Sequence, residues 1–367
     1  MGRDAFARLL AAEEAMKIMR AMALGLLCCV SALAQTNSYT VTPIVDNTQD
    51  PLLVNGWGLS RPAKASVSEG EWWVSDNATG YTTLYYANQT GTASIAPLAI
   101  SIPTSIGTGI GSPTGTAYNA ATGPGPGLNN FTFATLDGTI SNWNAGQTPP
   151  PGGTGCYECH VNTATIMVNH GSAAASYFGM TIATNATAKA LAYYVTNFKA
   201  GVVEAYDATL FTPVTLSGTF TDPKIPKSYK PYGIQAIGSK IWVSYFNGTS
   251  GGFVDAFDTN GNLKLRLAKG NFSEPWGIVQ APANFGAFSS SLLVGNTTSG
   301  QIAAFSPTTG AFLGFLQDST GTTIVIPGLW GISFGNGNKK SGPVTTLYYA
   351  AGGNTYQTGV FGAITAN

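Results

Sequence analysis

The sequence predicts an all-β fold assembled from six copies of one unit. Two observations carry this prediction: the composition, and a short glycine-centred motif that recurs along the chain. Among 367 residues, 46 glycines and 20 prolines are too many for a helical protein. The 18 Phe, 16 Tyr and 7 Trp are too many for a disordered one. Single all-β domains of this length are common, so one domain is compatible with the chain length.

The recurring motif places a glycine among apolar, aromatic or small residues. Its six copies occupy residues 56–59, 113–116, 177–180, 231–234, 275–278 and 329–332. The central glycines, from Gly58 to Gly331, are 57, 64, 54, 44 and 54 residues apart. Such a long period indicates a repeat architecture, in which each copy is one supersecondary unit.

Two apolar runs follow each motif. The first runs cover 72–75, 131–134, 192–195, 241–244, 292–295 and 347–350, and the second cover 83–86, 138–143, 202–206, 253–257, 301–305 and 359–364. Short runs rich in β-branched and aromatic residues, bounded by turn formers, are typical of strands. Three to four strands per unit predict the blades of a six-bladed β-propeller.

The motif glycine and the chain ends have expected roles in this ring. Inner strands converge on a central channel, where glycine lets neighbouring backbones approach closely. The adjacent aromatic residue, such as Trp57 or Trp276, is expected to fill the wedge between blades. The last unit offers only three strands, so residues 39–45 are expected to supply the fourth. This predicts a ring closed by the N-terminal strand joining the C-terminal blade, which removes an exposed edge.

The N-terminus has the pattern of a signal peptide. Lys17 and Arg20 precede an apolar run over 21–30, and the residues before Gln35 fit a cleavage site after Ala34. The run is shorter than the ~20 residues that cross a bilayer. We therefore expect a signal peptide over 1–34, with 1–15 as an upstream extension before a start at Met16. Export to the periplasm or the exterior follows, with one propeller domain over 35–367.

Charge and hydropathy exclude some partners of the mature chain. No later segment is apolar enough to cross a membrane, so no membrane span is expected. The formal net charge is +0 and no basic run occurs, so a nucleic-acid partner is not expected.

A Pro/Gly-rich insertion at about 144–162 carries the sharpest chemical motif. Cys156, Cys159 and His160 form the C-x-x-C-H pattern by which c-type haem is attached through two thioethers and an iron-ligating histidine. His170 or Met180 is the candidate distal ligand. The alternative is a Cys156–Cys159 disulfide in an oxidising compartment. No fourth ligand for a structural zinc is evident.

A second candidate site consists of polar residues at or just beyond the ends of equivalent strands. These residues are Asp76, Asn77, Asp137, Asn197, Asn247 and Asn296. Equivalent positions share one face of a propeller, where such groups can bind Ca²⁺ or a sugar. The alternative is that they cap turns through local hydrogen bonds. Asp76 or Asp137 with Glu274 is the candidate acid–base pair for a glycan. No hydrolase elbow or zinc-protease motif occurs.

Several segments carry a family resemblance. They are 50–58, 73–77, 133–141, 220–223, 275–278 with 281–282, 293–296 and 328–331. In this order they resemble a family of uncharacterised bacterial exported propeller proteins with NHL-like repeats, over essentially the whole mature chain. The resemblance implies the fold but no activity. Some members carry a sorting tail with a Pro-Glu-Pro motif; residues 362–367 lack it, so sorting by that route is not expected.

The functional expectation is an exported propeller that acts as a binding or scaffold module. Its ligand, a small molecule, a glycan or a protein, is not specified by the sequence. The first alternative is a monohaem c redox protein using the C-x-x-C-H loop. The second is a propeller hydrolase acting on a lactone or a glycan.

Overall fold

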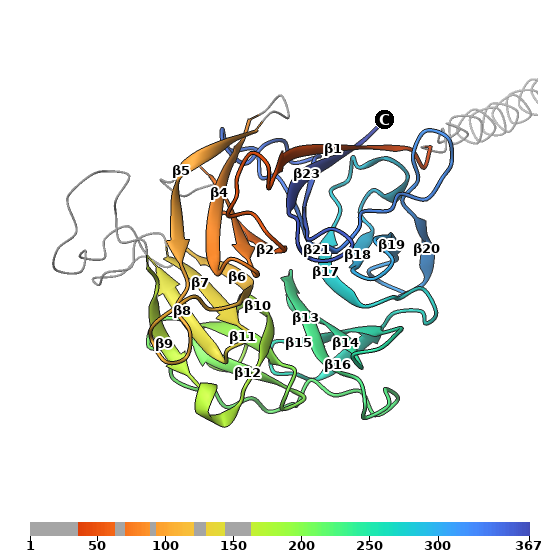
Figure 1. Cartoon of the computed structure of the whole chain (residues 1–367). Coiled ribbons are helices and arrows are strands. Elements are labelled where there is room, and N and C mark those ends of the chain that lie inside the picture. Colours follow the sequence, from red (N-terminus) through yellow and green to blue (C-terminus); the bar gives the residue numbers. More distant parts are fainter. Residues whose placement is uncertain (1–35, 63–69, 89–92, 121–129, 144–162) are drawn as a thin grey trace, which may run out of the picture. The chain divides into compact units, whose positions relative to one another are not determined.

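Six small β-sheets lie around a central axis, in the order in which they occur along the chain (Figure 1). The computed structural model describes residues 36–62, 70–88, 93–120, 130–143 and 163–367, and residues Asn37–Asn367 belong to one unit. The first strand of each sheet contacts the first strand of the next, and the sixth contacts the first. This arrangement confirms the predicted six-bladed β-propeller.

The first two blades contain four strands each. Blade 1 has β2 (Gly56–Ser60), β3 (Trp72–Asp76), β4 (Tyr81–Ala87) and β5 (Ala93–Ser101). Blade 2 has β6 (Pro113–Asn119), β7 (Asn130–Thr135), β8 (Thr139–Trp143) and β9 (Thr165–Asn169). The predicted insertion at 144–162 lies outside the described residues.

The next two blades differ in strand number. Blade 3 has β10 (Tyr177–Thr184), β11 (Leu191–Asn197) and β12 (Val202–Asp207), after the short 3-10 helix η2 (Gly171–Ala173). A single bridge from Tyr206 to Pro213 stands where a fourth strand would pair. Blade 4 has β13 (Lys230–Ile237), β14 (Lys240–Phe246), β15 (Phe253–Asp258) and β16 (Leu263–Arg266).

The last two blades complete the ring. Blade 5 has β17 (Pro275–Gln280), β18 (Leu292–Asn296), β19 (Ile302–Phe305) and β20 (Phe312–Phe315), with the 3-10 helix η3 (Gly286–Phe288) before β18. Blade 6 has β21 (Leu329–Phe334), β22 (Leu347–Ala351), β23 (Val360–Ala366) and, as its outer strand, β1 (Tyr39–Asp46). The antiparallel register runs from Tyr39 opposite Ala366 to Asp46 opposite Val360. The predicted closure by the N-terminal strand is therefore confirmed.

The core lies between neighbouring sheets, which explains why the strands are apolar on both faces. Along β22, Tyr348 and Ala350 pack with blade 1, whereas Leu347 and Tyr349 pack with blade 5. Successive side chains of a strand point to opposite faces, and here both faces are covered by a neighbouring blade. Burial on both sides favours a continuous apolar run over the alternating pattern of a half-exposed sheet.

The motif glycines bring the six inner strands together. A Cβ on Gly115 would stand 2.2 Å from the amide nitrogen of Met180 in the next blade. Each of the other motif glycines would meet the backbone of its neighbour in the same way: Gly58, Gly179, Gly233, Gly277 and Gly331. Each inner strand also has a register shift at its motif, where the local twist increases and side chains are redirected. The predicted close approach is confirmed.

The motif aromatic residues differ from the prediction. They do not lie only in wedges between adjacent blades but pack against one another across the axis. The ring centroids of Trp57 in blade 1 and Trp276 in blade 5 are 6.2 Å apart. The indole N–H of Trp276 donates to the carbonyl of Phe178 in blade 3, at 2.9 Å. The bulge before each glycine turns these side chains inward, so they close one end of the channel.

Candidate functional site at the mouth of the central channel

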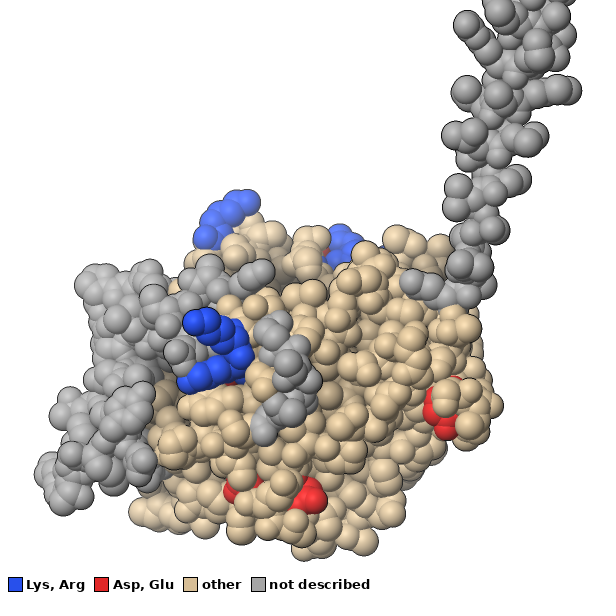
Figure 2. All heavy atoms as spheres, turned by 90° about the horizontal axis from the view of Figure 1, so that it is seen from above, with Lys and Arg blue, Asp and Glu red and all other residues tan. Residues whose placement is uncertain are grey.

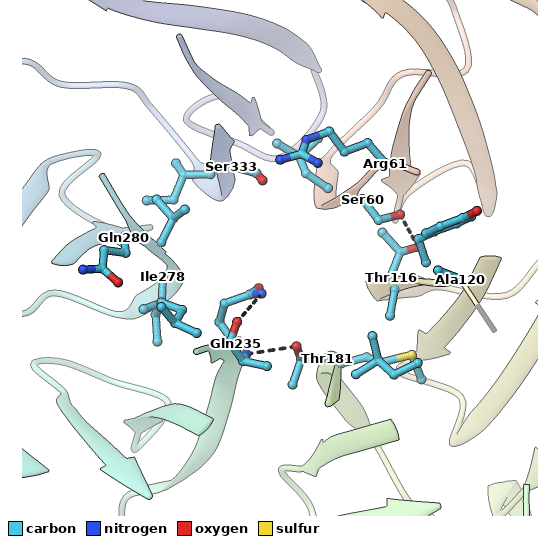
Figure 3. Close-up of a pocket in the computed structure, with 18 residues that line it drawn as sticks. Ser60, Arg61, Thr116, Ala120, Thr181, Gln235, Ile278, Gln280 and Ser333 are labelled. Atoms are coloured by element: carbon cyan, nitrogen blue, oxygen red, sulfur yellow. Dashed lines mark hydrogen bonds between the residues drawn. The ribbon is translucent and has the colours of Figure 1, made fainter. Parts of the chain in front are cut away.

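A cavity of about 460 Å³ opens at the C-terminal ends of the inner strands, and we call it the channel mouth (Figure 3). All six inner strands contribute to its wall. Its lining residues are Leu59–Arg61, Thr116–Tyr118, Ala120, Met180–Ile182, Gln235–Ile237, Ile278–Gln280, Ile332 and Ser333. Cavities that hold small molecules commonly have volumes of about 300–1,000 Å³.

Polar groups ring this cavity at equivalent positions of the repeat. Ser60, Thr181, Gln235 and Ser333 each lie two residues after the motif glycine of their blade, and Thr116 lies one residue after Gly115. The residue directly after the glycine is apolar in the other five blades and lines the deeper part of the channel. The channel mouth therefore combines an apolar floor with hydroxyl and amide groups at its rim.

The rim groups are positioned by short hydrogen bonds between neighbouring blades. The Ser60 and Thr116 hydroxyls lie 3.0 Å apart, and the amide N–H of Ala236 donates to the Thr181 hydroxyl at 3.0 Å. In Figure 3 these two bonds link blade 1 to blade 2 and blade 3 to blade 4. Gln280 points away from the cavity, where its amide donates to the carbonyl of Ser290.

Arg61 is the only Lys, Arg, His, Asp or Glu among the described residues that line the channel mouth. Its Nε and Nη2 donate to the carbonyl oxygen of Phe334 in blade 6, at 2.9 and 2.7 Å. Its guanidinium carbon lies over the buried ring of Trp72, 5.4 Å from the centroid. Burial lowers the pKa of Arg61 to about 10, which leaves it a cation at neutral pH.

The channel narrows below the mouth and ends at the aromatic cluster. A space of about 30 Å³ continues between Leu59, Met180, Ile234, Ile278 and Ile332. Beyond it lie the packed rings of Trp57, Tyr232, Trp276 and Trp330, all at most 9% exposed. A ligand that enters from the mouth therefore meets a closed end.

Asp76 and Asn77, predicted as ligand-binding residues, lie at the opposite end of the inner strands from the channel mouth. Asp76 pairs with Gly56 at the start of β2 and is fully buried. Its burial raises the pKa of its carboxyl well above the ordinary value, and the charge of Asp50 adds to this effect. The Asn77 amide donates to the carbonyl of Pro113 at 3.1 Å.

The other polar candidates bond to nearby backbone groups. The Asp137 carboxylate accepts a hydrogen bond from the backbone N–H of Ser112 at 2.7 Å. The side-chain oxygen of Asn247 accepts one from the backbone N–H of Thr249 at 2.9 Å. The side-chain oxygen of Asn296 accepts one from the backbone N–H of Ser273 at 2.9 Å. Such bonds stabilise turns and satisfy the side-chain oxygens within the protein.

Asn197 and His170 belong to a polar cluster of blade 3 that also contains Glu204, a residue not expected from the sequence. The Asn197 amide donates to Glu204 Oε1 at 2.7 Å, and the hydroxyls of Tyr177 and Tyr206 donate to Oε2 at 2.8 and 2.5 Å. His170 Nδ1 lies 2.8 Å from the Tyr177 hydroxyl. His170, Glu204 and Tyr206 line a second cavity of about 450 Å³.

The proposed haem ligands do not meet among the described residues. Met180 lines the channel mouth, whereas His170 lines the cavity of blade 3. Cys156, Cys159 and His160 lie outside the described residues, as does the predicted signal peptide. The haem, disulfide and export hypotheses stay predictions.

Apart from Met180, which the sequence suggested only as a haem ligand, the residues of the channel mouth were missed by sequence reasoning, although a signal for them existed. Aligning the repeats on the motif glycine places a polar residue two positions later in four of six blades. Arg61, one position further in blade 1, has no charged counterpart in the other blades. The polar residues predicted from the sequence, such as Asp76, lie at or just beyond the ends of the second strands instead, at the other end of the channel.

Comparisons with curated proteins return viral relatives of unknown activity. The chain is 28% identical over 215 residues to the uncharacterized protein R640 of Acanthamoeba polyphaga mimivirus, covering 55% of this chain and 37% of that protein. It is 26% identical over 311 residues to the uncharacterized protein L690 of the same virus, covering 77% and 74%. A third relative, the uncharacterized protein R648 of the same virus, is 32% identical over 130 residues. These residues cover 32% of this chain and 32% of that protein. The chain spans about a third of the length of R640 and R648, and no family model matches.

Solved structures with a similar fold are propeller proteins. The PQQ-bound aldose sugar dehydrogenase of Streptomyces coelicolor has a TM-score of 0.53 at 12% identity, covering 90% of this chain and 99% of that one. A luciferin-regenerating enzyme has a TM-score of 0.52 at 11% identity, covering 89% and 95%. At such identities the likeness shows the fold alone. None of the described helical segments has the length and hydrophobicity to span a membrane.

Proposed function

We propose that this protein is an exported binding protein that holds a small polar molecule in the channel mouth. The observation that carries the proposal is the cavity of about 460 Å³ to which all six inner strands contribute. The export part rests on the signal-peptide pattern before Gln35.

The chemistry of the rim favours a ligand with several hydrogen-bonding groups. The hydroxyls of Ser60, Thr116, Thr181 and Ser333 can each donate and accept, and the Gln235 amide offers both functions. A molecule bearing hydroxyl or carbonyl groups can use the hydrogen-bonding capacity that these groups retain beside their bonds within the protein, whereas a purely apolar molecule makes no use of it. The apolar floor, which includes Ile278 and Ile332, removes nonpolar surface of the ligand from water.

The lining supports binding over acid–base catalysis. Among the described residues of the channel mouth there is no Asp, Glu, His or Cys, and the hydroxyl groups there have no such side chain beside them to act as their base.

The test is calorimetric titration of the protein with D-glucose and D-gluconate, two hydroxylated probes of similar size. We expect saturable binding of at least one, and loss of that binding in Ser333→Phe, which fills the mouth. Ser319→Phe, on an exposed turn of blade 5, is the matched control and should bind as the wild type does. Absence of binding for both probes and also for D-glucose 6-phosphate, or equal binding by the Ser333→Phe variant, would contradict the proposal.

A further inference from the structure

Arg61 is incompletely paired, although it is partly buried. A guanidinium has five N–H donors, and two of them donate to Phe334. No other hydrogen bond or ion pair of Arg61 occurs within the described part of the chain. Three donors therefore remain for a partner at the channel mouth.

Arg61 is held at the wall of the channel mouth, so its remaining donors lie beside the cavity. The two bonds to the Phe334 carbonyl fix the guanidinium between blades 1 and 6, and Trp72 supports it from one side. In Figure 3 the side chain extends from β2 along the rim toward Ser333. A guanidinium held this way is preorganised, so little side-chain entropy is lost when it binds a ligand.

A buried cation without a carboxylate partner is costly, and an anion that binds beside it offsets this cost. No Asp or Glu of the described residues lies within salt-bridge distance of Arg61, although Arg266 and Lys264 each have such a partner. The planar fork of guanidinium donors matches the two oxygens of a carboxylate or a phosphate.

The chain as a whole carries few charges. Charged residues make up 9% of it, and the side of the molecule in Figure 2, which is turned by 90° from the view along the channel axis, shows Lys, Arg, Asp and Glu in small separate groups. Arg61 is the only charged residue among the described residues that line the channel mouth. Recognition of an anion at the channel mouth would thus depend on Arg61 rather than on a broad basic surface.

We infer that the channel mouth selects small hydroxylated oxyanions, with Arg61 binding the anionic group and the rim hydroxyls and amide binding the rest. This inference rests on the proposed function and names the class of its ligand. The shared chemistry is an oxyanion on a polyol, and a carboxylate or a phosphate could provide it.

Four probes of similar size test the inference by calorimetric titration: D-gluconate, D-glucose 6-phosphate, D-glucose and D-glucosamine. We expect one or both anions to bind at least about tenfold more tightly than glucose, and glucosamine to bind most weakly. The first two probes distinguish a carboxylate ligand from a phosphate ligand. The preference for the anion should decrease as ionic strength rises.

Variants connect this preference to Arg61. Arg61→Met keeps much of the side-chain volume and should bring the affinity for the anions down to that for glucose. Lys240→Met, which removes a cation that lies over Trp242 away from the cavity, should change nothing. If Arg61→Met does not fold, the wild-type protein is titrated in the presence of inorganic phosphate instead. Phosphate should then weaken the apparent binding of whichever of gluconate and glucose 6-phosphate binds more tightly.

Two outcomes overturn the inference and are distinguishable from failure of the proposed function. If glucose and both anions bind equally tightly, and the Arg61→Met variant binds all three as the wild type does, anion selection is refuted while the proposed binding site stands. No binding by any of the four probes would refute both.

Discussion

The carbonyl oxygen of Trp57 lies 2.5 Å from the point where a Cβ on Gly331 would stand. This contact joins blade 6 to blade 1. The ring therefore closes at its inner strands, and it closes a second time at its outer edge, where β1 is the outer strand of blade 6. Both closures bring together residues from the N-terminal and the C-terminal parts of the propeller.

Gly331→Ala is expected to destabilise the protein by ~1–3 kcal/mol, because the added methyl group forces two inner strands apart. The measurement is urea unfolding followed by tryptophan fluorescence. Gly295→Ala is the matched control: its nearest obstacle is the Leu329 side chain at 3.1 Å, which can move. Equal stability losses in both variants would contradict the role assigned to the inner-strand contact.

A buried pair of carboxyl groups, Asp222 before β13 and Asp255 on β15, predicts a pH dependence of stability. Burial raises the pKa of Asp255 to about 8, and the charge of Asp222 contributes. Asp222 bonds to Arg266, which lowers the pKa of Asp222 to about 2. In the unfolded chain both carboxyls have a pKa near ~4.

The two groups act over different pH ranges. For Asp255 the raised pKa contributes stability that is fully present below ~pH 4 and is lost as the pH rises toward 8, by up to ~1.4 kcal/mol per pH unit. For Asp222 the lowered pKa contributes stability that is present above ~pH 4 and lost as the pH falls toward 2. Asp255→Asn should therefore flatten the decrease between pH 5 and 8 in urea unfolding. An unchanged slope in this variant would contradict the assignment.

The blade 3 cluster predicts a structural role for Glu204. Glu204→Gln is expected to cost ~1–3 kcal/mol, because one amide cannot accept from two tyrosine hydroxyls and from the Asn197 amide together. Tyr206→Phe removes one donor without stranding another and should cost less. Both free energies come from the same urea titration. A larger loss in Tyr206→Phe than in Glu204→Gln would show that the carboxylate is not the organising group.

The Cys156 and Cys159 pair gives a prediction that does not depend on the propeller. Protein purified from a host able to attach c-type haem is expected to be colourless and two hydrogens lighter than its reduced mass, as a disulfide requires. Visible absorption with intact mass is the measurement. A Soret band and a mass gain of one haem, both lost when the two cysteines are replaced by alanine, would establish the haem alternative instead.

The fold was predictable because its determinants are local and repeated. The motif glycines are needed wherever two inner strands touch, and every blade repeats that contact, so the period is visible without any structure. The closing strand was predictable because the last unit offers only three strands before the chain ends, while residues 39–45 form an extended run ahead of the first motif.

The candidate site was not predictable to the same extent, because no single segment contains it. Ser60, Thr181 and Ser333 become neighbours only when the ring closes, and the bulge at each motif decides which side chains face the axis. The same bulges turn Trp57 and Trp276 inward, against the expectation that they fill wedges. Arg61 carries no repeat signal at all, since its role arises from the Phe334 carbonyl of another blade.

The most direct test of the central claim is a crystal structure of the protein soaked with D-gluconate. The account predicts the ligand in the channel mouth, with its carboxylate on the free N–H groups of Arg61 and its hydroxyls on Thr181, Gln235 or Ser333. Gluconate bound elsewhere, for example at the aromatic end of the channel, with the mouth empty of ligand, would contradict it.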